Sequence, residues 1–185
     1  RWIAILGQFL TVNVAKYVLN FEFDILIINF VIALGSISNI ILIYFYKKNI
    51  LSNRASFSFL LIDIIQLSLI LYFSGGVINP FSIFLIIPSV FSSSNLSFKT
   101  SLSLILITIF SIILLTLFHE HLIYPSGKRL IINDFYHYGT SISLIIALIF
   151  LNYFAILFGR ESNLRKEALN KIEEFIAKEH ELVSL

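Results

Sequence analysis

The sequence predicts an all-α integral membrane protein, organised as a six-helix transmembrane bundle followed by a cytoplasmic coiled-coil helix. The chain of 185 residues is 58% hydrophobic and 13% charged, with a mean hydropathy of +0.92. A soluble domain of this size cannot bury so much apolar surface. The sequence also contains six long apolar runs, and a charged segment rich in helix formers follows the last of them.

A membrane-spanning helix needs roughly 20 mostly apolar residues. The six runs cover residues 2–19, 26–46, 55–73, 81–96, 100–118 and 138–158. The fourth is the weakest, because Pro88 lies inside it and a Ser-Ser-Ser-Asn sequence follows. Pro88 cannot donate a hydrogen bond to the carbonyl of Phe84, so we expect a kink there, with that carbonyl bonded by a hydroxyl group.

The basic residues of the short loops predict the orientation of the chain. With six crossings, one side carries Arg1, Lys47, Lys48, Arg54, Lys99, Arg160, Arg165 and Lys166. The other side receives residues 20–24, the turn 74–79 and the loop 119–137, whose basic residues are Lys128 and Arg129. We therefore expect a multi-pass protein of the bacterial inner (plasma) membrane, with the lipid bilayer around it and both termini cytoplasmic.

The composition changes at residue 160, where charged helix formers begin. A 3-4-3-4 spacing connects Leu169, Ile172, Ile176, Glu179 and Val183, which is the spacing of a coiled-coil seam. We expect this segment to continue the sixth helix and to form a homodimer; the alternative is an amphipathic helix on the membrane surface. The expected domains are a six-span transmembrane domain at 1–159 and a cytoplasmic linker helix at 160–185, the start of a dimerisation region. We also expect that the chain has been trimmed and that further sequence follows it.

The turn SGGVINPF, residues 74–81, lies between the third and fourth runs. Gly75 and Gly76 can adopt positive φ and allow a close approach to the backbone. Asn79 is a preferred N-cap and Pro80 suits the first helical position, so a helix should begin here and direct its free N–H groups at the turn. With Phe81 as an aromatic wall and the Asn79 amide as a further donor, the turn suits a small carbonyl-bearing lipophilic ligand. A well-capped hairpin turn is the alternative.

Three polar residues lie where lipid or apolar packing is expected: Asp63 and Gln66 in the third run and Asn39 in the second. An ionisable group inside a span is a functional hypothesis, here a transport or proton-coupling role. The alternative is a buried hydrogen-bonding node that fixes helix packing, with Asn39 and Asn152 reaching Asp63 across the bundle. Close-packing and interhelical bonding roles are expected of Gln8, Asn13, Gly35, Ser36 and Ser38.

Three of the four histidines, His119, His121 and His137, flank one loop. In a His-x-His sequence the two rings point to opposite faces of a strand and diverge on a helix. There is no cysteine to supply a thiolate, so we expect no metal and interpret the loop as solvated. His180 is expected to be exposed. We recognise no catalytic constellation in the chain.

The order of the motifs is distinctive: RWIAILGQ, NRASFSFLLIDIIQL, SGGVINPFSIFLIIPSVFSS, GRESNLRKEAL and AKEHELVSL follow one another. This order resembles the membrane sensor of the RegB/PrrB (ActS/RegS) family of redox-responsive sensor histidine kinases. The resemblance implies six spans and a GGxxNPF signature linked to ubiquinone, matched at Gly75, Gly76, Asn79, Pro80 and Phe81. It also implies that the phosphoacceptor histidine, the ATP-binding domain and a redox-active cysteine lie beyond Leu185, and that His180 is not the phosphoacceptor.

The expected function is therefore that of a signal-input module in a two-component system. It would sense the membrane redox state by binding ubiquinone at the GGxxNPF turn and pass the signal through a dimeric output helix. A cognate response regulator would be contacted only by the kinase domain, and no nucleic-acid partner is expected. The alternatives are a small transporter or channel with Asp63 as the coupling residue, or a passive membrane anchor for a cytoplasmic enzyme.

Overall fold

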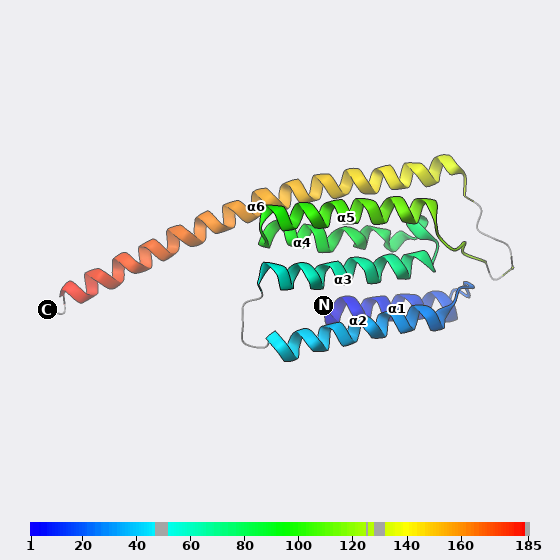
Figure 1. The fold of residues 1–185 in the computed structure, drawn as a ribbon, viewed down its shortest axis with the longest axis horizontal. Helices are drawn as coiled ribbons and strands as arrows, with labels where there is room; N and C mark the ends of the chain where they lie inside the picture. Colours follow the sequence, from blue (N-terminus) through cyan, green and yellow to red (C-terminus); the bar gives the residue numbers. More distant parts are fainter. Residues whose placement is uncertain (47–51, 125, 128–131, 184–185) are drawn as a thin grey trace.

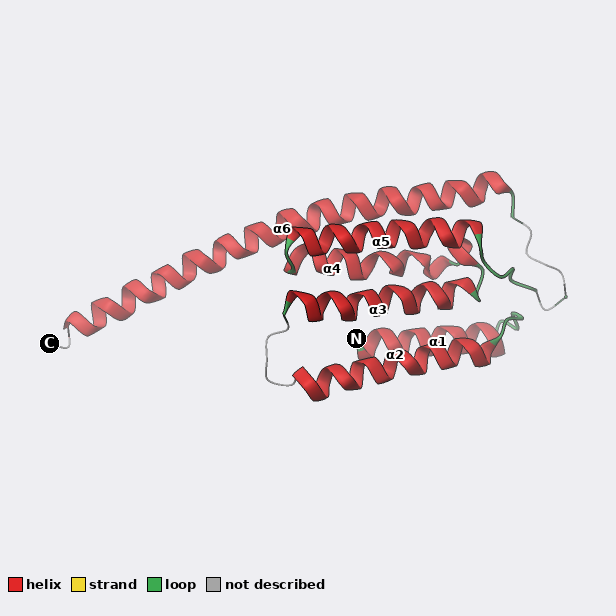
Figure 2. Cartoon of the chain, viewed as in Figure 1, coloured by secondary structure: helices red, strands yellow, loops and turns green. Residues whose placement is uncertain are grey.

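The structure is a computed structural model that describes residues 1–46, 52–124, 126–127 and 132–183. Its α-helices are α1 (Trp2–Tyr17), α2 (Ile25–Tyr46), α3 (Asn53–Tyr72), α4 (Ile87–Asn95), α5 (Phe98–Leu117) and α6 (Asp134–Val183). Two 3₁₀ helices, η1 (Gly76–Ile78) and η2 (Pro80–Ile86), precede α4. Figure 2 shows no strand among the described residues, where β pairing is limited to an isolated bridge between Glu22 and Ile123. The predicted all-α fold class is confirmed.

The helices run up and down alongside one another, with α3 in the middle of the bundle (Figure 1). The α1–α2 hairpin packs against one side of α3, and α4 and α5 pack against the other, with α6 covering them. Two apolar cores result: one from α3 to α6 with η1 and η2, and a smaller one where α1 and α2 meet Ile70 of α3. Because successive helices are antiparallel, the segments 18–24, 73–79 and 118–124 lie together at one end of the bundle.

In the described part of the chain, four helices are long and apolar enough to cross a membrane: Ile25–Phe45, Asn53–Tyr72, Phe98–Leu117 and Asp134–Lys178. The first and fourth predicted spans are helical but shorter. α1 has 16 residues. The apolar helix Pro80–Asn95 is also shorter than 18 residues. At 1.5 Å per residue, a 16-residue helix is about 24 Å long, short of the roughly 30 Å hydrocarbon core.

Polar and apolar side chains are distributed as expected for a protein in lipid. Buried positions between the helices include many polar residues: Asn39, Gln66, Ser74, Ser82, Ser89, Ser92, Ser93, Ser101, Thr108, Ser141 and Asn152. Large apolar side chains cover the outside, among them Ile3 at 87% and Leu26 at 79% exposure. Such a surface would aggregate in water, whereas buried hydroxyls and amides can bond across helices in a bilayer. The chain is a membrane protein.

The predicted hydrogen bond from a hydroxyl group to the Phe84 carbonyl, beside Pro88, is wrong. The chain before it winds as the 3₁₀ helix η2 and becomes α-helical at Ile87, with Pro88 in the first turn of α4. The Phe84 carbonyl accepts from the backbone N–H of Ile87, not from a hydroxyl. A 3₁₀ helix bonds residues three apart, so the donor that Pro88 lacks is not needed.

Helix α6 is continuous over 50 residues and extends well beyond the bundle (Figure 1). Gly159 lies against α4, where an added Cβ would come within 2.6 Å of the Ser94 carbonyl oxygen. Beyond it, residues 160–178 are exposed. The predicted continuation of the sixth span into the charged segment is confirmed, whereas its pairing as a coiled coil stays a prediction. The side chains of Glu179, His180 and Val183 lie outside the described residues, as do Lys47, Lys48, Lys128 and Arg129.

Candidate ligand-binding site

The glycine turn has the backbone geometry that its residues predict. Gly75 and Gly76 have φ of 101° and 64°, the left-handed region that favours glycine. Pro80 begins η2, and the Asn79 side-chain oxygen accepts a hydrogen bond from the Phe81 N–H at 2.9 Å. The predicted helix start at Asn79-Pro80 is therefore confirmed, although the first helix after it is 3₁₀.

The Asn79 amide is committed within the turn. Its Nδ2 donates to the Ser74 carbonyl oxygen at 2.9 Å and to the Ser74 hydroxyl at 2.8 Å. The backbone N–H of Ser82 also has a partner, the Asn79 carbonyl, at 2.9 Å. The expected donors to a ligand, the Asn79 amide and the first N–H groups of the helix, are thus used to hold the turn closed.

The space beside the two glycines is filled by the segment that follows α5. A Cβ added to Gly76 would lie 2.7 Å from Cγ of His119 and 2.9 Å from the Leu115 carbonyl oxygen. A Cβ added to Gly75 would lie 2.8 Å from the side chain of Leu122. The close approach that these glycines permit is therefore made by the chain itself.

Phe81 lies on the outer surface of η2, with 43% of its area exposed. Its ring is 5.8 Å from that of Phe84, which is also exposed. Pro80 is exposed beside it. The five residues of the GGxxNPF pattern therefore divide into two buried glycines, a bonded asparagine and an exposed Pro-Phe pair.

The predicted divergence of the His119 and His121 rings is wrong, whereas Glu120 and His121 are exposed as predicted. The rings of His119 and His121 stack with centroids 5.3 Å apart, and the ring of His137, in the first turns of α6, meets His119 edge-on at 4.9 Å. Residues 119–121 are neither strand nor helix, so the alternation that separates such rings does not apply. His119 and His137 are half-buried, and the loop is anchored by Glu120 N–H bonding the Tyr72 carbonyl at 2.9 Å.

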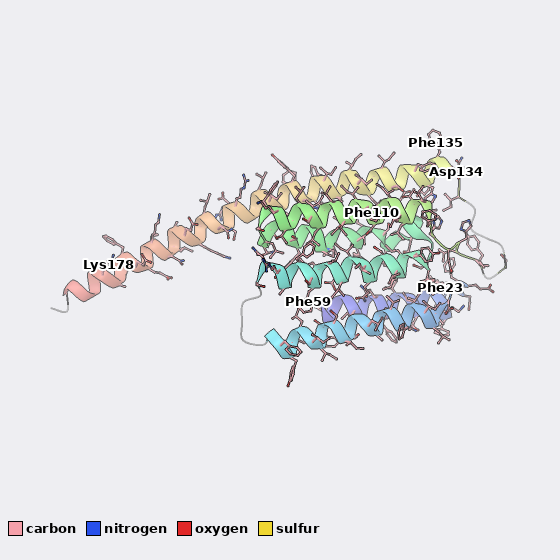
Figure 3. The ribbon with its side chains drawn as sticks, in the orientation of Figure 1. Phe23, Phe59, Phe110, Asp134, Phe135 and Lys178 are labelled. Atoms are coloured by element: carbon pink, nitrogen blue, oxygen red, sulfur yellow. The ribbon has the colours of Figure 1, made fainter. Side chains whose placement is uncertain are left out.

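A cavity of about 220 Å³ lies between this loop, the glycine turn and the start of α6. Its lining combines Gly75, Ile78, His119, His121, Leu122, Ile132, Asp134 and His137. Figure 3 labels Asp134 at this end of the bundle. Nδ1 of His119 and Nε2 of His137 are buried without a hydrogen-bond partner among the described residues. A ligand in the cavity can bond these two ring nitrogens when the imidazole rings turn toward it.

Burial lowers the pKa of His119, and the neighbouring rings of His137 and His121 lower it further, while the nearby Leu115 carbonyl opposes the shift. A neutral imidazole has one donor nitrogen and one acceptor nitrogen, and the two can exchange roles. With its proton held toward the Leu115 carbonyl, His119 offers its other ring nitrogen as an acceptor, which suits a hydroxyl group. Among the described residues, no group of three or more His, Cys, Asp or Glu is arranged to hold a metal ion.

Asp63 is bonded to Arg1 midway along α3. The Arg1 guanidinium forms an ion pair with the Asp63 carboxylate and lies 3.5 Å from the Ser38 hydroxyl. It also lies over the ring of Phe59, which Figure 3 labels away from the end of the bundle that carries Asp134. This ion pair links the start of α1 to α3. A proton pathway would instead need several ionisable groups in succession.

The other predicted polar residues do not join Asp63. Gln66 bonds Gln8 of α1 at 2.9 Å and packs against Gly35, while Asn152 bonds Ser93 at 2.6 Å and Ser89 at 3.0 Å in α4. Asn39 is buried, and its Nδ2 has no partner among the described residues. The predicted packing roles of Gln8, Gly35 and also Asn13, which bonds Asn29, are confirmed, whereas the reach of Asn152 to Asp63 is not found.

Sequence reasoning missed His119 and His137 as walls of a cavity. A signal was available: with antiparallel spans, the loop 119–137 must lie at the same end as the turn 74–79. It went unused because solvated histidines in loops are common.

No family model and no solved structure matches the chain. Among curated proteins it is similar to the sensor histidine kinase RegB of Cereibacter sphaeroides, at 25% identity over 186 aligned positions. The alignment covers all of this chain and 40% of that protein, so the chain spans less than half the length of its relative. The resemblance indicated by the motif order is confirmed: over its whole length, this chain resembles part of a RegB-type sensor histidine kinase.

Proposed function

We propose that this chain is the membrane input module of a two-component sensor histidine kinase, and that it senses the redox state of the membrane by binding ubiquinone at the Gly75–Phe81 turn. The observation that carries the proposal is the course of α6. This helix begins at the cavity beside the turn and continues for 50 residues, past the bundle. A change at its first turn can therefore be passed to the far end by a rigid element.

The signal would leave through a homodimer formed by the exposed part of α6. Leu169, Ile172 and Ile176 lie along it at 58%, 55% and 48% exposure, in the spacing of a coiled-coil seam. A kinase domain joined to this helix would contact the cognate response regulator. No catalytic role is assigned to the residues of this chain.

Six crossings of the bacterial inner membrane, with both termini cytoplasmic, complete the proposal. The short helices α1 and Pro80–Asn95 would be accommodated by local thinning of the bilayer or by their position inside the bundle. Single cysteines at Asn53 and Lys99, both exposed, should react only from the cytoplasmic side, and those at Glu120 and Ser126 only from outside. Labelling of Lys99→Cys from outside would mean that the fourth segment re-enters without crossing.

The functional test is to purify the protein that contains this chain from native membranes, extract it, and measure the ubiquinone that is recovered with it. Quinone should be recovered at up to one molecule per binding site, and Phe81→Ala should reduce it more than Asn79→Ala does in folded protein. If the full-length protein contains no quinone and its kinase activity does not respond to added quinone, the proposal is wrong and the chain is a passive membrane anchor.

A further inference from the structure

We propose that the polar ring of the ligand occupies the cavity between the glycine turn and the histidine loop, where His119 and His137 hydrogen-bond the oxygens of a quinone or quinol head. This inference rests on the proposed function and deepens it. It moves the hydrogen-bonding role from Asn79 to two residues outside the GGxxNPF pattern.

The first step is the availability of bonding atoms. The Asn79 amide already bonds Ser74, and the Phe81 N–H bonds Asn79. By contrast, His119 Nδ1 and His137 Nε2 are buried and unpartnered among the described residues. A buried polar atom without a partner is costly, so a ligand that bonds it gains more than one that must displace an existing bond.

The second step is size and shape. A cavity of about 150 Å³ can hold benzene, so one of about 220 Å³ accommodates a substituted six-membered ring. Ile78, Leu122 and Ile132 supply apolar walls for its faces. Both carbonyl-bearing and hydroxyl-bearing forms of the ring can be bonded, because neutral imidazole nitrogens act as donor or acceptor.

The third step is the link to the output. His137 lies in the first turns of α6. His119 packs so closely against Gly76 that a Cβ added to this glycine would lie less than 3 Å from the His119 side chain. A ring in the cavity that both histidines line would touch both the turn and the helix that leaves the bundle. Exchange of quinone for quinol changes acceptors to donors at that contact, which can shift the start of α6.

The test uses the full-length protein in lipid nanodiscs with decyl-ubiquinone as the probe. We expect His119→Phe and His137→Phe each to weaken binding roughly two- to tenfold, the effect of one lost hydrogen bond, and the double variant by roughly the product. Tyr124→Phe removes a polar group from the same loop outside the cavity lining and serves as the matched control, with unchanged affinity. A photoreactive quinone should label residues 119–122 or 132–137.

Three outcomes decide between the inference and the proposed function. Weaker binding in folded histidine variants with labelling of the loop supports both. Unchanged affinity in the histidine variants, with labelling confined to residues 81–84, overturns the inference and leaves the proposed function intact. A wild-type protein that binds no quinone overturns both. His119→Gln, which keeps a donor and an acceptor, provides a second variant if His119→Phe does not fold, and should retain more affinity.

Discussion

Polar side chains are bonded differently in the middle of the bundle and at the end that carries the turn 74–79. Midway along α3, Asp63 has its ion pair with Arg1 and Gln66 bonds Gln8. At the end that carries the turn, the rings of His119 and His137 pack together, and a nitrogen of each is left without a partner among the described residues. The carboxylate that looked functional in the sequence is satisfied, and the histidines that looked ordinary are not.

This difference distinguishes polar groups that stabilise helix packing from polar groups that are available to a ligand. Paired groups in an apolar bundle hold helices in register, and removing one partner leaves the other uncompensated. Unpartnered groups beside a cavity cost stability and persist where a ligand or a conformational change uses them. The four predictions below test the comparison, beginning with the largest expected effect.

Replacing Gly76 with alanine should cost about 2–5 kcal/mol of unfolding free energy, combining roughly 1–2 kcal/mol for a left-handed non-glycine residue and roughly 1–3 kcal/mol for overpacking. Gly127→Ala is the matched control: its φ is 73°, but no atom of the described residues lies within 4 Å of an added Cβ. It should therefore show only the backbone cost. Thermal unfolding in detergent measures both, and equal losses would mean that the loop does not press on Gly76.

Asp63→Leu should lower the free energy of unfolding by about 3 kcal/mol, because the guanidinium of Arg1 loses its charged partner in an apolar setting. Asp63→Asn should be milder, since the amide keeps a hydrogen bond. Combining Arg1→Leu with Asp63→Leu should cost less than the sum of the single changes. Strict additivity in this double-mutant cycle would show that the pair does not fasten α1 to α3.

Asn79→Ala should cost about 1–2 kcal/mol of stability, because the helix loses its N-cap and the turn loses its bonds to Ser74. Quinone affinity of the folded variant should change less than in His119→Phe. Asn79→Asp keeps the acceptor for Phe81 N–H and loses the donors to Ser74, so it should be intermediate in stability. If Asn79→Ala lowers quinone affinity more than His119→Phe does, the ligand is bonded by the turn and not by the histidines.

The smallest expected effect is one of pH. The lowered pKa of His119 means that the unfolded state takes up a proton first as pH falls through about 6.5, so folding stability should decrease below that pH and be unchanged above it. His121, His137 and Asp134 line the same cavity, and Glu120 lies in the same loop. His119→Gln should flatten the dependence of stability on pH. Melting temperatures at pH 7.5 and 5.5 provide the comparison, and an unaltered dependence in this variant would contradict the role given to His119.

The local features of the fold could be predicted from the sequence. Apolar runs located the helices to within a few residues, Asn79 and Pro80 marked the start of η2, and Gly75 and Gly76 took the positive φ expected of them. The uninterrupted run of helix formers past Gly159 predicted the length of α6. Each depends on the intrinsic preferences of residues close in sequence, and lipid enforces such patterns strongly.

Only the tertiary structure decided which polar groups meet. Asp63 bonds a residue 62 positions away, and Asn152 bonds α4, because helix rotation and register set these contacts. The loop after α5 has irregular backbone, so no periodicity predicted that His119 would stack on His121, meet His137 and rest on Gly76. Side-chain direction follows a simple period only within regular helices and strands, and the cavity is formed where that regularity ends.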